Sequence, residues 1–284
     1  MKKFTIALAQ IDSVLGDVNK NVIKHLEFVS KAKERGADLI VFPELSLTGY
    51  SIKDLNWDVA ISRKNDGIIQ TLKDASKDIS IVIGGVEESD NFGIYNSAFF
   101  LEMGLIAHVH RKVYPPTYGM FEESRYFLPG KVVKPYDSKV GKLGILICED
   151  LWHMSLPYLM ALQKVWLIIG MIASPTRLIP GEEKVKIAEV NANNCAAYAR
   201  LLSSYVVFCN RVGFEDGVNF WGGSFVADPQ GEIIAQAKLF EEDIIYADID
   251  PEQVRRSRKF SRHLLDENID IVTAELRRIR RDIQ

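Results

Sequence analysis

Short apolar runs alternate along the chain with longer segments in which apolar residues recur at helical spacing. The runs are rich in Val and Ile and end at polar or turn residues, which is typical of strands. They predict ten strands, at 4–10, 38–42, 80–86, 95–101, 105–111, 142–148, 166–173, 205–210, 222–228 and 244–249. Helical spacing predicts helices at 18–35, 60–77, 153–165, 183–203 and 264–280.

Turn residues between some of these strands indicate hairpins. Turn signals at 89–91 and 103–104 predict hairpins within 86–105, and the Asp228-Pro229-Gln230-Gly231 turn predicts another over 226–234. Ten strands are many for one open sheet, so we expect two sheets packed face to face with helices outside them. The predicted fold is an α/β, four-layer α-β-β-α sandwich in a single domain, 1–284. Its last part, 250–284, is a helical tail that we expect to pack at a subunit interface.

Charge and cysteine content narrow the function classes. The net charge of −3 and pI of about 6.0 give no general attraction to nucleic acid or anionic membranes. No apolar run approaches the roughly 20 residues that span a bilayer. Three cysteines, Cys148, Cys195 and Cys209, are too few for a disulfide framework and indicate a reducing compartment. We therefore expect a cytoplasmic protein, and no motif calls for a cofactor or a metal.

Three chemically active residues follow apolar runs directly. Glu44 follows 39–43, Lys112 follows 105–111, and Cys148 follows 143–147. Alone, each has a structural explanation: a surface or capping Glu, a solvated Lys, or a buried Cys of the kind we assign to Cys195 and Cys209. Together they form a chemical set. A thiol attacks an amide as thiolate, which needs a base, and the resulting oxyanion needs a positive group.

Three segments in this order resemble the catalytic blocks of the nitrilase superfamily of carbon–nitrogen hydrolases. They are FPELSLTGY (42–50), HRKVYPPTYGMFEESRYFLPG (110–130) and GILICEDLW (144–152). The blocks, together with RVGFEDGVNFWGGSFVADPQG (211–231), are most similar to the glutaminase domain of glutamine-dependent NAD synthetases. No SGGxDS-like pyrophosphatase loop occurs, so we expect no synthetase domain in this chain. The superfamily has an α-β-β-α sandwich and usually dimerises.

The resemblance implies roles for individual residues. Glu44 is the general base, Cys148 the nucleophile, and Lys112 stabilises the oxyanion together with the backbone N–H of Glu149. The Pro129-Gly130 pair implies Glu123 as a supporting glutamate, with the adjacent Glu122 as the alternative. The expected pocket consists of aromatic walls and polar anchors: Tyr50, Tyr118, Trp152, Ser174 and Arg177. Arg177 lies closer to the Ser174-Pro175 pair than the carboxylate-binding arginine of those glutaminases, which leaves glutamine open as substrate.

Two hypotheses of different class follow. The first is a free-standing amidase or carbamoylase that acts on a small metabolite, and we expect it to be a homodimer or a multiple of dimers. The second is a partner-dependent subunit, either a detached glutaminase that supplies ammonia to a synthetase or a non-catalytic protein.

Other patterns predict less. The alternation at 105–111 puts several polar side chains on one strand face with an apolar one: Ile106, His108, His110 and Lys112. His108 and His110 could bind a metal, but zinc hydrolases need a third ligand, and we expect none. Ser224 lacks the second glycine of a nucleophile elbow, so we expect a strand residue. The Arg-rich tail is diluted by acidic residues and carries an apolar stripe, which favours helix packing over nucleic-acid binding.

Overall fold

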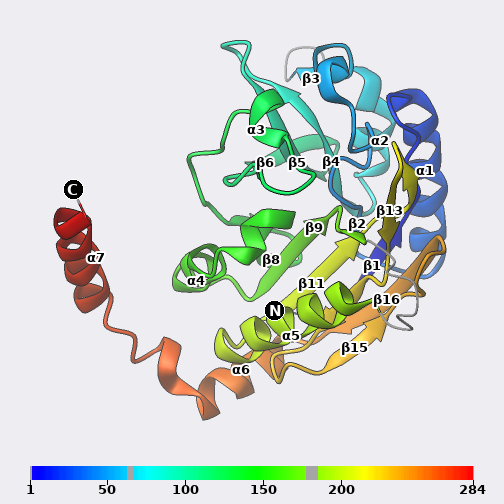
Figure 1. The fold of residues 1–284 in the computed structure, drawn as a ribbon. Helices are drawn as coiled ribbons and strands as arrows, with labels where there is room; N and C mark the ends of the chain where they lie inside the picture. Colours follow the sequence, from blue (N-terminus) through cyan, green and yellow to red (C-terminus); the bar gives the residue numbers. More distant parts are fainter. Residues whose placement is uncertain (1, 63–66, 177–184, 284) are drawn as a thin grey trace.

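The computed structural model of the chain describes residues 2–62, 67–176 and 185–283, and two large sheets dominate it (Figure 1). The first sheet has seven strands in the order β16-β1-β2-β4-β5-β6, with β3 paired to β4. Its strands are β1 (Phe4–Gln10), β2 (Leu39–Val41), β3 (Ile61–Ser62), β4 (Ser80–Glu88), β5 (Ile94–Glu102), β6 (Leu105–Arg111) and β16 (Asp243–Ile249). β1, β2 and β4 are parallel, whereas β4-β5 and β5-β6 are antiparallel.

The second sheet has six strands in the order β15-β14-β11-β9-β8-β7. Its strands are β7 (Tyr136–Ser138), β8 (Gly141–Ile147), β9 (Leu167–Ile172), β11 (Tyr205–Asn210), β14 (Phe225–Ala227) and β15 (Ile233–Gln236). A small third sheet contains β10 (Pro175–Thr176), β12 (Val212–Glu215) and β13 (Val218–Trp221). The helices are α1 (Val18–Glu34), α2 (Gln70–Ala75), α3 (Glu123–Tyr126), α4 (Ser155–Leu162), α5 (Lys186–Leu201), α6 (Pro251–Phe260) and α7 (Ile269–Ile283). The described residues also form the 3₁₀ helices η1 (Lys53–Trp57), η2 (Gly67–Ile69), η3 (Cys148–Trp152) and η4 (Arg262–Leu264).

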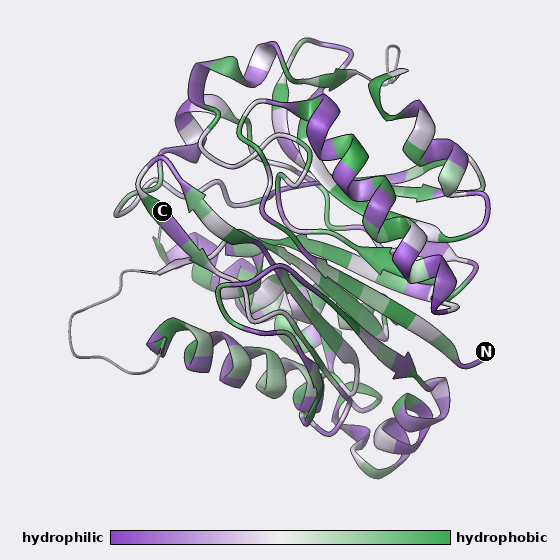
Figure 2. Ribbon diagram, turned by 90° about the vertical axis from the view of Figure 1, so that its right-hand side faces the viewer, coloured by the Kyte–Doolittle hydropathy of each residue, from purple (hydrophilic) through white to green (hydrophobic). Residues whose placement is uncertain are grey.

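Alternating side chains divide the apolar core into layers. Leu8 of β1 packs between the two sheets, in one cluster with Ile147 and Ile169 of the second sheet. Ala7, one residue earlier, belongs to a separate cluster with Phe28 of α1. On the far side of the second sheet, apolar side chains pack against α4 and α5 in a third cluster. This order of helix, sheet, sheet and helix confirms the predicted α-β-β-α sandwich, and Figure 2 shows the apolar strands lying between helices with polar outer faces.

The strands at 4–10, 105–111 and 205–210 match their predictions, as do the hairpins. The helix predicted over 60–77 is wrong at its start, because Ile61 pairs with β4 and α2 begins only at Gln70. The strand predicted over 222–228 begins at Phe225. Gly222 has a φ of +71°, a left-handed backbone conformation that favours glycine, and a Cβ there would lie 2.4 Å from Val212. The chain therefore turns tightly beside β12 at this residue, and β14 starts after the turn.

The predicted face of β6 is also wrong at one residue. The β5-β6 register shifts between Phe100 and Leu101, which indicates a β-bulge. Ile106 therefore packs in the cluster that contains α1, whereas His108 stacks on Tyr136 at the inter-sheet side.

The C-terminal tail contains two α-helices instead of the single one predicted over 264–280. α6 begins at Pro251, where the Asp250 side chain caps the helix by accepting a hydrogen bond from the Glu252 backbone N–H. α6 packs on the body through Pro251 and Val254, but α7 has no buried residue. That the tail packs at a subunit interface stays a prediction. Within the described residues, no helix is both long and apolar enough to span a membrane.

Candidate active site

Glu44 lies in the loop that follows β2, as its position after an apolar run predicted. Its side chain is buried, and the loop lies next to β4. Gly84 of β4 makes this possible, because a Cβ there would lie 2.5 Å from the backbone of Pro43 and Leu45. The loop can therefore cross closely over β4, and it turns the carboxylate of Glu44 inward.

Lys112 follows β6 and is buried between two carboxylates. Its Nζ lies 2.7 Å from Glu44 Oε1 and 2.7 Å from Glu123 Oε1. Burial by itself would lower the pKa of Lys112, but the charges of Glu123 and Glu44 outweigh it and hold that pKa well above its ordinary value. The ammonium therefore stays protonated at neutral pH.

Glu123, at the start of α3, completes this cluster. The Tyr50 hydroxyl donates to its Oε1 at 2.6 Å. Burial raises the pKa of Glu123, and Lys112 opposes that shift. Glu122 is exposed instead. Of the two adjacent glutamates that the sequence left open, Glu123 is thus the one that joins Glu44 and Lys112.

Asn96 of β5 is a member of the cluster that sequence reasoning missed. Its Nδ2 donates to Glu44 Oε1 at 2.8 Å and lies 3.5 Å from Glu123 Oε2. The sequence signal that could have indicated Asn96 was the position of a polar residue inside a largely apolar strand. Because the amide holds both carboxylates, it fixes their orientation about Lys112.

Cys148 stands at a sharp turn between β8 and the 3₁₀ helix η3. Its φ of +45° is uncommon for a residue other than glycine, and such strained positions cluster at functional sites. The buried Asp150 side chain supports the turn, because its carboxylate accepts hydrogen bonds from the backbone N–H groups of Ile147 and Val113. The turn is thereby tied to the segment that follows Lys112.

The Cys148 thiol opens onto a cavity of about 470 Å³. Burial and the charge of Glu44 raise the pKa of Cys148, and the positive charge of Lys112 only partly offsets this. The thiol is therefore protonated at neutral pH. Among the described residues, Glu44 Oε2 is buried without a hydrogen-bond partner, so it can accept a proton.

Three of the predicted pocket residues line the cavity: Tyr118, Trp152 and Ser174. Glu149 also lines it, and its carboxylate accepts a hydrogen bond from the Tyr118 hydroxyl at 2.7 Å. Tyr50 contacts Glu123 instead. Arg177 lies outside the described residues.

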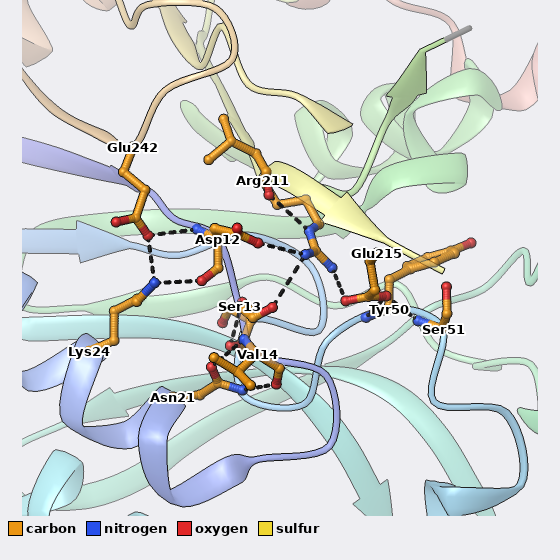
Figure 3. Close-up of polar contacts among 12 residues, drawn as sticks. Asp12, Ser13, Val14, Asn21, Lys24, Tyr50, Ser51, Arg211, Glu215 and Glu242 are labelled. Atoms are coloured by element: carbon orange, nitrogen blue, oxygen red, sulfur yellow. Dashed lines mark hydrogen bonds and ion pairs between the residues drawn. The ribbon is translucent and has the colours of Figure 1, made fainter. Parts of the chain in front are cut away.

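A buried ion pair supports the loop that carries Tyr50 (Figure 3). Arg211 Nη1 lies 2.6 Å from Glu215 Oε2, and both side chains are almost fully buried. The other oxygen of Glu215 accepts hydrogen bonds from the backbone N–H groups of Tyr50 and Ser51. The pair therefore connects β12 to the loop between Glu44 and Tyr50.

The remaining candidates have structural partners. His110 Nε2 lies 3.0 Å from Asp150 Oδ2, and the His108 ring stacks on Tyr136. In the part of the chain that the structure describes, no group of three or more His, Cys, Asp or Glu could hold a metal ion. The Ser224 hydroxyl accepts a hydrogen bond from the Asn210 backbone N–H, so it holds neighbouring segments together.

Comparisons with known proteins identify the family to which the chain belongs. The chain is 33% identical over 255 residues to the glutamine-dependent NAD(+) synthetase of Acinetobacter baylyi, an alignment that covers 90% of this chain and 46% of the relative. It is 35% identical over 283 residues to the Thermotoga maritima enzyme of the same name, covering 98% of this chain and 45% of the relative. The chain thus spans less than half the length of these relatives.

Solved structures give the same result. A carbon-nitrogen hydrolase from Helicobacter pylori superposes with a TM-score of 0.86 at 26% identity, covering 96% of this chain and 98% of that one. The glutamine-dependent NAD+ synthetase of Acinetobacter baumannii superposes with a TM-score of 0.79 at 32% identity, covering 89% and 47%. The sequence profile of the carbon-nitrogen hydrolase family matches residues 5–259. The chain therefore belongs to the carbon-nitrogen hydrolase family, within the nitrilase superfamily.

Proposed function

We propose that the chain cleaves the C–N bond of a carboxamide or N-carbamoyl group in a small polar metabolite, through a thioester on Cys148. The observation that carries this proposal is the buried cluster of Glu44, Lys112 and Glu123, whose charges act on a thiol at a cavity wall. Each group of the cluster meets one requirement of amide hydrolysis.

The first step moves the thiol proton. Because the pKa of Cys148 is raised, the thiol needs a base as it attacks, and the unpartnered Oε2 of Glu44 takes its proton. The sulfur then bonds to the carbonyl carbon, and the C=O electron pair moves to oxygen. Lys112 and the backbone N–H of Glu149 stabilise this oxyanion.

The intermediate then collapses. The C–N bond breaks, Glu44 returns its proton to the departing nitrogen, and ammonia or an amine leaves while a thioester remains. Water, deprotonated by Glu44 and oriented with Glu123, attacks the thioester. The C–S bond breaks, the acid is released, and the proton held by Glu44 returns to the sulfur.

The cavity wall indicates a substrate class. The carboxylate of Glu149 lies at this wall beside Cys148 and favours a substrate that carries an ammonium group. Glutamine is such a carboxamide, and the relatives above are named as glutamine-dependent. These two observations favour the second candidate function, a glutaminase that supplies ammonia to a partner synthetase. The chain would then release ammonia efficiently only when docked.

Ammonia release from a panel of ω-amides, N-carbamoyl compounds and glutamine tests both functions, with and without an added synthetase. We expect Cys148→Ala and Cys148→Ser to lose turnover by several orders of magnitude. Cys195→Ala is the matched control, because that thiol is buried in α5 outside the cluster. Near-normal turnover of either Cys148 variant would exclude the thioester route. If the wild-type chain releases no ammonia from any compound of the panel, with or without synthetase, the result would favour a non-catalytic subunit.

A further inference from the structure

α7 exposes an apolar stripe that the rest of the described chain does not cover. None of its described residues is buried, and Figure 1 shows the helix standing apart from the sheets. Ile269, Leu276 and Ile283 are 50%, 62% and 79% exposed. A contiguous apolar stripe of this kind marks an interaction surface in a soluble protein.

The stripe has the spacing of a helix-pairing seam. Its residues alternate at three and four positions, as the a and d sites of heptads do: Ile269, Val272, Leu276, Ile279 and Ile283. Ile271 is the one apolar residue of α7 outside this series, apart from Ala274. The seam covers about two heptads, so it is short and must act with the folded domain that carries it.

Charges beside the seam indicate its partner. With Ile269 at a, Glu275 falls at a g position and Arg280 at the next e position. In a parallel pair of identical helices, the g residue of each faces the following e residue of the other, so Glu275 meets Arg280 twice. In an antiparallel pair, g faces g, and the acidic Glu275 and Asp282 would repel each other. Self-complementarity therefore requires the parallel arrangement.

Existing ion pairs on α7 do not compete strongly with this contact. Arg278, at an outer c position, lies 2.7 Å from Glu275 and 2.9 Å from Asp282 of its own helix. All three side chains are half exposed, and such surface pairs contribute little. Glu275 can therefore contact a second copy while it keeps its own partner.

We propose that α7 pairs in parallel with α7 of a second copy of this chain, along the seam defined above. This proposal does not depend on the catalytic function, and its test uses no activity.

Disulfide cross-linking tests the seam. In full-length chain carrying Cys148→Ser, Leu276→Cys places identical a-site thiols together, whereas Arg278→Cys places them on the outer face. Cys195 and Cys209 are buried. We expect oxidation at micromolar protein to cross-link the Leu276→Cys chains about a hundredfold faster, since paired thiols have an effective concentration in the millimolar range. Equal rates for the two variants would overturn the proposal.

Charge exchange between Glu275 and Arg280 tests whether a second copy of the chain pairs along the seam. On the Leu276→Cys background, Glu275→Arg or Arg280→Glu alone opposes like charges across the seam and should slow cross-linking. Mixing the two variants, one of them carrying an affinity tag, should restore it specifically between unlike chains, because each then faces an opposite charge. A mixture that cross-links no better than either variant alone would overturn self-pairing. That result is expected if another protein or an anionic surface covers α7.

Discussion

Glu215 holds the backbone of Tyr50 in place: one of its carboxylate oxygens lies 2.8 Å from the Tyr50 backbone nitrogen. The Tyr50 hydroxyl in turn donates to Glu123 at 2.6 Å. The buried Arg211–Glu215 pair therefore reaches the Lys112 cluster through a single side chain. This relationship gives the Arg211–Glu215 ion pair a role in orienting the candidate active site.

Glu215→Ala should be strongly destabilising. It leaves Arg211 buried without its main counter-charge and removes the acceptor for two backbone N–H groups, and breaking a buried pair costs about 3–5 kcal/mol. The adjacent Asp216→Ala is the control, because its ion pair with Lys53 is half exposed and such surface pairs contribute little to stability. Urea unfolding measures both. Similar losses in the two variants would contradict a structural role for the buried pair.

Glu123→Gln should reduce turnover by about a hundredfold or more, the usual contribution of a group that assists proton transfer. The substitution preserves size but removes one of the two negative charges at Lys112. Glu122→Gln should leave turnover within about a factor of two, because surface substitutions away from the site have small effects. The kcat values for ammonia release decide between them, and equal effects would separate Glu123 from catalysis.

The sequence predicted the reactive residues better than the groups that orient them. Glu44, Lys112 and Cys148 each follow an apolar strand, so their positions could be inferred from pattern and resemblance. Asn96 could not, because it meets Glu44 only through the β4-β5 hairpin and the crossing of the loop over Gly84.

Long-range geometry explains the other differences. The buried Arg211–Glu215 pair was unpredicted, because a charged pair in sequence is usually solvated. The β-bulge that moves Ile106 to the other face depends on the pairing with β5, which strict alternation cannot include. The layers were predictable because the spacing of apolar residues in each buried strand and each amphipathic helix indicates which face is buried.

Glu149→Gln should distinguish substrates by charge. If the carboxylate binds an ammonium group, KM for ammonium-bearing amides should rise by about tenfold or more, since a charged hydrogen bond contributes about 1.5–3 kcal/mol. KM for neutral amides of similar size should stay nearly constant. Tyr118→Phe, which removes the hydroxyl that donates to Glu149, should have a smaller effect in the same direction. Equal changes for both substrate classes would assign Glu149 a structural role only.

His25 should make the folded state sensitive to acid. It is buried beneath the Glu44 loop, with its Nε2 2.9 Å from Ser46 Oγ, and burial lowers its pKa from 6.5 to about 4. Between these values the unfolded chain binds a proton that the folded chain does not, so stability falls as the pH drops from 6.5 to 4 and is unaffected above 6.5. The full effect is about 3 kcal/mol. Urea unfolding across this range should give a shallower dependence on pH for His25→Gln than for the wild type. If the two slopes are equal, other groups carry the acid sensitivity.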